Sequence, residues 1–218
     1  GFQPHGLQGL LIEKIYSTYK LADIQKGYPS KQERIVIAKN AENTATQLYE
    51  HFKNGLSALE NKQYDVAIEL FTKANSQVPF RENWNNIGVA YARKALALKV
   101  SSKAEIENPA RFLYPLEVEN KSRLLNERTR SLDDTTEEII ELLNHAQSAF
   151  EKALQLDPSF YKSCINLACV YDLQGKHNSA IAEITEKLPE ETRASKEAKI
   201  ILAIAYYNAD MEEKAEMI

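Results

Sequence analysis

Apolar residues recur every three or four positions along most of this chain, and two stretches repeat one pattern of them. Residues 67–79 and 146–158 both read Ala-x3-Phe-x2-Ala-x4-Pro. This spacing places the Ala and Phe side chains on one face of a helix, and the Pro marks the end of that helix. The seven prolines of the chain fall at the ends of such stretches and leave the helical pattern unbroken between them. The pattern therefore predicts an all-α fold.

A second pattern belongs beside each of these stretches, and it is fullest at Trp84, Ile87, Gly88 and Tyr91. The two patterns together make a helix–turn–helix unit that resembles the tetratricopeptide repeat of about 34 residues. The resemblance implies a right-handed α-solenoid in which each repeat contacts its neighbours. It also implies a non-catalytic scaffold that binds a peptide or helical segment of another protein in the concave groove of the repeats.

The resemblance divides the chain into a helical extension and a repeat domain whose second repeat is interrupted. The extension covers 1–47 and the repeat domain covers 48–218, with repeats at about 48–80, 81–160, 161–195 and 196–218, the last of them incomplete. In the second repeat the first helix carries Gly88, but the matching Ala of the second helix is Ala146. We therefore expect an insertion at about 100–135. Three repeats are about the minimum for mutual stacking, so the array is long enough.

Small residues are expected to let the two helices of each repeat approach closely, at Gly55, Gly88, Ala168 and Ala203. The rings of Phe71 and Phe150 are expected to fill the gap to the next repeat. Within the insertion, Phe112 or Tyr114 is expected to pack against the repeat helices near the groove mouth, because burying an aromatic ring removes a large apolar surface from water.

In this family the first helix of each repeat lines the groove. The resemblance assigns these groove positions to Phe52, Leu56, Asn85, Asn86, Val89, Lys162, Ile165, Asn166, Cys169, Ile200, Ile204 and Tyr207. Asn86 and Asn166 share the sixth position of their helices. An amide there can donate to and accept from the backbone of an extended peptide. The alternative is that both amides are merely hydrated groove residues.

The same positions indicate what kind of segment the groove would hold. Chaperone-binding members of the family clamp a C-terminal carboxylate, and Asn86 and Lys162 match that clamp, but Phe52, Leu56 and Asn166 do not. The apolar groove residues favour an apolar partner segment or helix instead. Their alternative role is packing against the insertion or a neighbouring chain. Self-association through the incomplete last repeat is a further expected interaction.

The first forty residues carry a second resemblance. The segments GFQPHGLQGLLIEKIY and GYPSKQERIVIA are similar to the tail of gluzincin-type zinc metallopeptidases. That tail has a His-Pro-x4-Arg motif, which Arg34 matches and which Tyr28-Pro29 alters. This resemblance implies an alternative function. The chain would be the C-terminal accessory or substrate-presenting region of a longer zinc metallopeptidase whose catalytic part lies upstream.

The chain itself shows no pattern of catalytic chemistry. It contains no H-E-x-x-H, no G-x-S-x-G and no phosphate-binding glycine loop, and its histidines, at 5, 51, 145 and 177, are isolated from other candidate ligands. We expect no catalytic residue, no metal and no cofactor.

Charge and hydropathy argue against nucleic acid and membrane insertion, and the cysteines do not identify the cellular compartment. The net charge of −4, with both signs interspersed, offers no basic surface for nucleic acid. No apolar run approaches the roughly 18 residues of a membrane span. Cys164 and Cys169 are too far apart around one predicted helix to bridge each other, so we expect reduced, buried thiols. They do not distinguish the cytoplasm from a bacterial periplasm.

Overall fold

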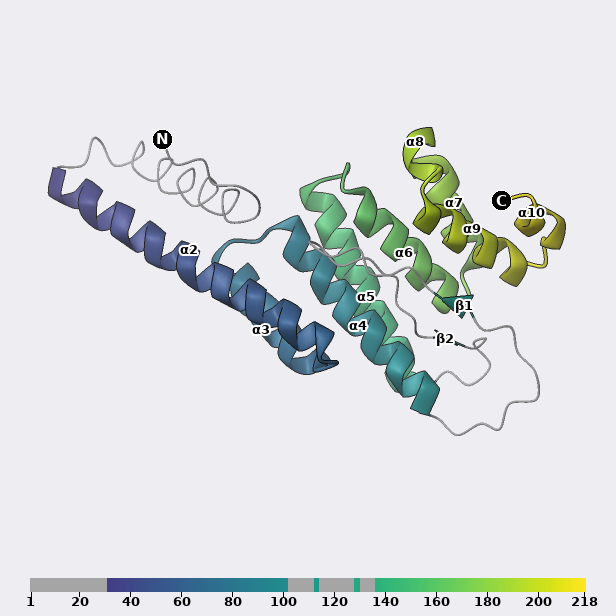
Figure 1. The fold of residues 1–218 in the computed structure, drawn as a ribbon, viewed down its shortest axis with the longest axis horizontal. Helices are drawn as coiled ribbons and strands as arrows, with labels where there is room; N and C mark the ends of the chain where they lie inside the picture. The colour runs from purple at the N-terminus through teal and green to yellow at the C-terminus, as the bar shows by residue number, and fades with distance from the viewer. Residues whose placement is uncertain (1–30, 102–111, 114–127, 130–135) are drawn as a thin grey trace.

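A computed structural model of the chain describes residues 31–101, 112–113, 128–129 and 136–218. The helices are α2 (Lys31–Glu60), α3 (Tyr64–Gln77), α4 (Arg81–Ser101), α5 (Glu137–Leu156), α6 (Tyr161–Leu173), α7 (His177–Lys187), α8 (Glu190–Arg193), α9 (Lys196–Asn208) and α10 (Glu212–Glu216). They follow one another from α2 in purple to α10 in yellow (Figure 1). The predicted all-α class is confirmed. The metallopeptidase-like segment before Lys31 and the side chains of Phe112 and Tyr114 lie outside what the structure describes.

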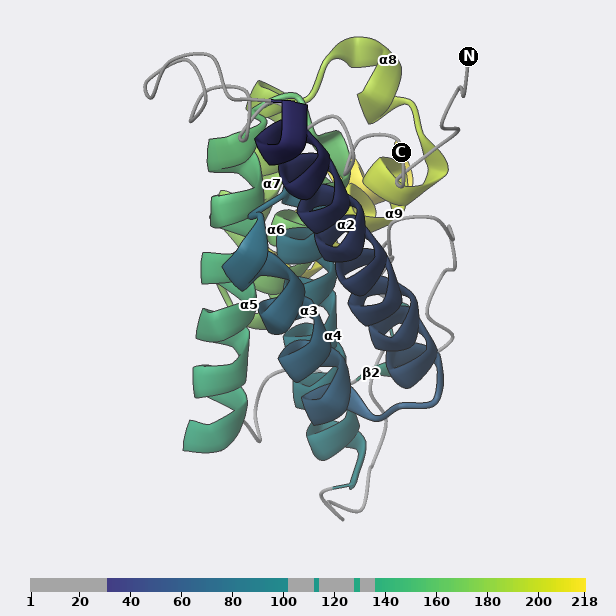
Figure 2. The same cartoon turned by 90° about the vertical axis from the view of Figure 1, so that its left-hand side faces the viewer.

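The helices pack in consecutive pairs. α2 packs on α3, α4 on α5, α6 on α7 and α9 on α10, while the first helices of successive pairs also touch, α2 with α4, α4 with α6 and α6 with α9 (Figures 1 and 2). Two short strands, β1 (Phe112–Leu113) and β2 (Arg128–Thr129), lie between α4 and α5 in the sequence and pair antiparallel, with Phe112 opposite Thr129. The predicted boundary at residues 47 and 48 falls inside α2, which is one continuous helix.

Three of the four pairs share one turn. Lys62, Gly175 and Asp210 each stand two residues after the first helix of a pair and have positive φ angles of 59°, 76° and 58°. In each turn, the N–H of the residue after the left-handed one donates to the carbonyl oxygen five residues earlier, at 2.8–2.9 Å. The bonds run from Gln63 to Ala58, from Lys176 to Tyr171 and from Met211 to Tyr206. This is the Schellman arrangement that closes a helix with a left-handed residue. The sequence signal for it is clear only at Gly175, since glycine adopts this conformation without strain.

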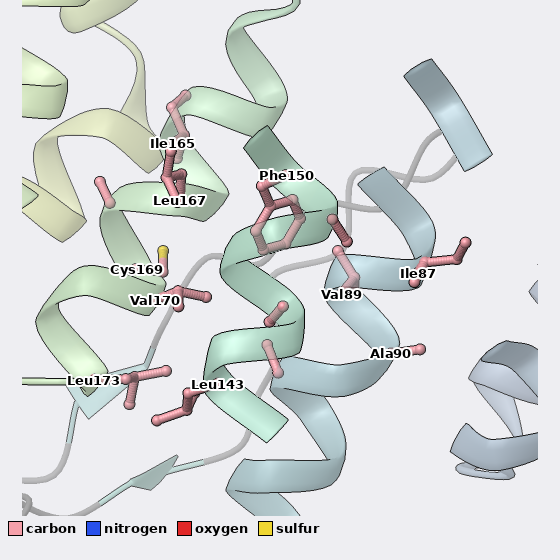
Figure 3. Packing of buried hydrophobic residues seen from close by; sticks show 14 of the residues in the cluster. Ile87, Val89, Ala90, Leu143, Phe150, Ile165, Leu167, Cys169, Val170 and Leu173 are labelled. Carbon is pink, nitrogen blue, oxygen red and sulfur yellow. The ribbon is translucent and has the colours of Figure 1, made fainter. Parts of the chain in front are cut away.

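The two pairs that carry phenylalanine are held by the same glycine–ring contact. A Cβ atom placed on Gly55 would lie 2.6 Å from Phe71 Cε1, and one placed on Gly88 would lie 2.6 Å from Phe150 Cε1. The prediction of small residues at close approaches is therefore confirmed for both glycines. Each ring packs on the glycine of its own pair, a contact that the expectation of a ring filling the gap to the next repeat did not include. Figure 3 shows the Phe150 ring on α5 facing the part of α4 that carries Val89.

The two helices of the α4–α5 pair are longer than those of the α6–α7 pair that follows it. α4 has 21 residues and α5 has 20, whereas α6 and α7 have 13 and 11. The additional turns bury Leu96 on α4 and Ile139 and Leu143 on α5. Thr136 caps α5 by accepting from the Ile139 N–H, as Thr commonly does at this position. α4 ends at Ser101, close to the predicted start of the insertion.

Candidate functional site

The residues assigned to the groove lie on one row of helices. α2, α4, α6 and α9 are the first helices of their pairs and touch in succession. The structure therefore brings the assigned positions together along one side of the array, although they are spread over most of the sequence.

Most of those side chains are buried. Phe52, Asn85, Asn86, Val89, Ile165, Asn166, Cys169 and Ile204 are at most 5% exposed, Leu56, Lys162 and Ile200 are half-buried, and Tyr207 is 44% exposed. Phe52 belongs to the core, with its ring 5.8 Å from the Phe71 ring and 6.1 Å from the Phe80 ring. Phe52 is therefore a core residue and not the ligand contact that the resemblance assigned, because a ring packed on two core rings presents no surface to a partner.

A chain of amides joins α4 to α6. Asn166 Nδ2 and Ser163 Oγ both donate to Asn85 Oδ1 at 2.9 Å, and Asn85 Nδ2 donates to Asn86 Oδ1 at 3.3 Å. All four side chains have no exposed surface. Asn86 and Asn166 are therefore buried amides that join helices, neither hydrated in a groove nor accessible to the backbone of a peptide. Asn85 is the centre of the network, and Ser163, which no sequence pattern singled out, is part of it.

A second polar group joins three helices at a buried carboxylate. Asp172 on α6 has no exposed surface; its Oδ1 lies 2.7 Å from His177 Nδ1 on α7, and its Oδ2 accepts from Asn208 Nδ2 on α9 at 2.8 Å. The turn after α6 brings His177 to the Asp172 side chain, so this histidine has a hydrogen-bond partner, and in the described part of the chain no further candidate ligands gather with the pair to form a metal site. A carboxylate with two partners on other helices holds those helices in register.

The cysteines are buried and form no disulfide, as expected. Cys164 Sγ donates to Glu183 Oε1 at 3.3 Å, and Lys187 Nζ donates to Glu183 Oε2 at 2.6 Å. Burial, followed by the Glu183 charge, raises the pKa of Cys164 far above its ordinary value of 9.0. The hydrogen bond to Glu183 raises the pKa of Lys187. The Cys164 thiol therefore stays protonated at neutral pH and is a poor nucleophile.

Accessible groove positions remain at the two ends of the row. On α2, Leu56 is half-buried, and two further residues of the same helix are accessible, Tyr49 at 39% exposure and the exposed Lys53. On α9, Ile200 is half-buried and Tyr207 is exposed. These residues combine aromatic and aliphatic surface with little charge, a composition typical of the central part of protein interfaces.

In the described part of the chain, no three His, Cys, Asp or Glu side chains gather closely enough to hold a metal ion. Among the described helices, none combines the length and apolar character that a membrane crossing requires. Comparison of the chain with models of known protein families and with curated proteins gives no match.

Proposed function

We propose that the chain is a protein-interaction scaffold of the tetratricopeptide type, a right-handed α-solenoid that binds a peptide or helical segment along its first helices. The observation that carries this proposal is the recurrence of one unit. The same glycine–ring contact holds α2 to α3 and α4 to α5, and the same left-handed turn closes three pairs. A stack of such units exposes one row of helices, and proteins built in this way use the extended concave surface for binding.

The partner we propose is an apolar segment, and its contacts are the accessible residues at the ends of the row. Tyr49 and Leu56 on α2 and Ile200 and Tyr207 on α9 offer rings and aliphatic groups that are not fully used in the core. Aromatic side chains in such positions commonly carry much of the binding energy of an interface.

Selection of peptides from a random display library tests this proposal without knowledge of the natural partner. We expect enriched apolar peptides whose affinity falls at least about tenfold, or about 1.4 kcal/mol, when Tyr49→Glu or Tyr207→Glu places a charge on the surface. Ile140→Glu is the matched control, because Ile140 is 47% exposed on α5, a second helix of its pair. Enrichment of no peptide, or equal losses with Ile140→Glu, would contradict the proposal.

A further inference from the structure

α2 presents a row of accessible side chains along one face. The row, which we call the α2 stripe, consists of Tyr49, Lys53, Leu56 and Glu60. Their spacing of four, three and four residues places them within about 60° of one another around the helix, over a length of about 16 Å. Tyr49 is 39% exposed, Lys53 and Glu60 are exposed, and Leu56 is half-buried.

The equivalent stripes of the next two first helices are closed. Counted from Gly88 and Ala168 as the α2 stripe is counted from Gly55, they consist of Glu82, Asn86, Val89 and Arg93 on α4 and of Lys162, Asn166, Cys169 and Leu173 on α6. Apart from the half-buried Lys162, all of these residues are at most 7% exposed.

The difference follows from the neighbours of each helix. α4 packs against α3, α5 and α6, and α6 packs against α4, α5, α7 and α9. α2 packs mainly on α3 and stands at one end of the described helices (Figures 1 and 2). The α2 stripe is therefore accessible, whereas neighbouring helices enclose α4 and α6 from both sides.

The accessible residues of α9 lie on a different face of their helix. The central positions of the equivalent stripe on α9 are Ile201 and Ile204, which are 0% and 5% exposed. Ile200 and Tyr207 each precede a stripe position by one residue and so lie about 100° away from it around the helix. The α2 stripe is therefore a surface of its own, separate from the accessible surface of α9.

Lys53 gives the α2 stripe a charge that α4 and α6 do not have at this position. The equivalent residues, Asn86 and Asn166, carry amides, which both donate and accept, whereas an ammonium group only donates. Lys73 on α3 is paired with Glu69, but Lys53 has no ion pair within the part of the chain that the structure describes. A carboxylate is the acceptor that complements it best, because a charge-assisted hydrogen bond is stronger than a neutral one.

The residues on either side of Lys53 favour a helical partner. Tyr49 and Leu56 stand two helical turns apart, and side chains at that spacing on a second helix can pack on both of them. An extended segment would need hydrogen-bond partners for its own backbone. Those of α2 are used within the helix, and Lys53 offers no acceptor.

We propose that the α2 stripe is a binding site for an amphipathic helical segment of another protein. In that segment an acidic side chain, which pairs with Lys53, lies between two apolar side chains, which pack on Tyr49 and Leu56. The proposal names the partner of the α2 end and rests on the proposed scaffold function. One helix face of this length buries less than the roughly 1,200 Å² of stable interfaces, so we expect weak and reversible binding.

A designed helical peptide tests the charge requirement. The probe is an alanine-rich peptide of about 18 residues, above the length at which isolated helices are marginal. It carries Leu side chains two turns apart and Glu side chains between them. Fluorescence anisotropy should show that it binds the intact chain about two- to fivefold more tightly than the same peptide with Gln in place of Glu. The difference should shrink at high salt, because salt screens exposed charges.

Exchange of the two charges locates the pair. Lys53→Glu should weaken binding of the Glu probe by about two- to tenfold and should strengthen binding of a probe with Lys in place of Glu. Lys73→Glu is the matched control, because it makes the same charge change at an exposed lysine of α3 and should alter both affinities less than about twofold. Tyr49→Ala should weaken both probes, since it removes an apolar contact and no charge.

Equal affinities of the Glu, Gln and Lys probes would overturn the proposal, and so would equal responses to Lys53→Glu and Lys73→Glu. Failure of all three probes to bind would overturn it as well. Circular dichroism of both variants verifies that they keep their helices. The scaffold function is judged separately by the random display library. Enriched apolar peptides that lack an acidic residue and do not respond to Lys53→Glu would support that function and contradict the acidic partner.

Discussion

The α2–α3 pair and the α4–α5 pair are built on the same contact but joined in different ways. In both, a glycine on the first helix meets a phenylalanine ring on the second at the same 2.6 Å approach of a placed Cβ. Three residues, including the left-handed Lys62, join α2 to α3, whereas the connection from α4 to α5 runs from Ser101 to Thr136. The pairing geometry therefore does not depend on the length of the connection.

The pairing geometry is independent of the connection because two helices pair through complementary faces. The length of the loop between them affects only the entropy of closing it. Each doubling of a flexible loop adds only about 0.6 kcal/mol to the cost of closing it. Burying one large apolar side chain stabilises by about 1.5–3 kcal/mol, and the extended turns of α4 and α5 bury several. The additional core between α4 and α5 thus offsets the cost of their longer connection.

Removing the phenylalanine rings should give the largest loss of stability, and it tests whether the two pairs are held in the same way. We expect Phe71→Ala and Phe150→Ala each to lower the free energy of unfolding by about 3–5 kcal/mol, since both rings are 0% exposed and each change leaves a cavity. Urea unfolding followed by circular dichroism measures both. The exposed Ile140→Ala should change stability by less than about 0.5 kcal/mol. A much smaller loss for Phe150→Ala than for Phe71→Ala would show that the interrupted pair is not held like the uninterrupted one.

Adding a single methyl group at the glycines should change the free energy of unfolding by less, but the direction of the change tests the close approach. In an ordinary helix, Gly→Ala stabilises by about 0.5–1 kcal/mol. Here we expect Gly55→Ala and Gly88→Ala to destabilise by about 1–3 kcal/mol, because the new Cβ overlaps a ring that is packed on all sides.

A double variant isolates the contact. Combining Gly88→Ala with Phe150→Leu should cost less than the sum of the two single changes, because the smaller side chain makes room for the methyl group. Stabilisation by Gly88→Ala alone, measured by the same urea titration, would contradict the close approach.

The two pairs differ at the fifth position of the repeat, which holds the apolar Phe52 on α2 and the polar Asn85 on α4. We expect Asn85→Ala to cost about 1–3 kcal/mol of unfolding free energy, since it leaves the donors of Ser163 and Asn166 buried without their acceptor. Ser163→Ala removes one donor and should cost about 0.5–1.5 kcal/mol. Equal, negligible losses in both variants would mean that the amide chain does not stabilise the α4–α6 contact.

The turn residues give the smallest expected change. Lys62 adopts a left-handed conformation that costs a non-glycine residue about 1–2 kcal/mol, part of which Gly would recover. Lys62→Gly should therefore raise the free energy of unfolding by up to about 1 kcal/mol, which appears as a slightly higher melting temperature. Gly175→Ala should lower the free energy of unfolding by a similar amount. The same sign for both variants would show that these turns are not equivalent.

Much of the helical order could be predicted because its signals are local. The Ala-x3-Phe-x2-Ala-x4-Pro pattern indicates α3 and α5, and the Pro after each marks its end. The extension of α4 to Ser101 and the short helix α8 could not be read in this way. The repeat pattern describes an average unit, and these additions depend on what each helix meets in the folded chain.

The positions of the candidate site residues on their helices could be predicted, but their exposure could not. Asn86 and Asn166 do occupy equivalent places on neighbouring helices, yet Asn85 and Ser163 link them in a buried network. Exposure of a side chain depends on every segment that reaches it, including segments distant in sequence. A motif that assigns residues to a groove therefore cannot state whether the groove is open.

By itself, the sequence determined most of the helices and the close helix approaches at Gly55 and Gly88, because periodicity and side-chain volume act over a few neighbouring residues. Only the tertiary structure decided that each phenylalanine ring packs on the glycine of its own pair, that Ser163 and Asn166 meet Asn85, and that Asp172 joins His177 to Asn208. These outcomes depend on contacts between residues far apart in the chain, whose free energy is gained only after the helices have stacked.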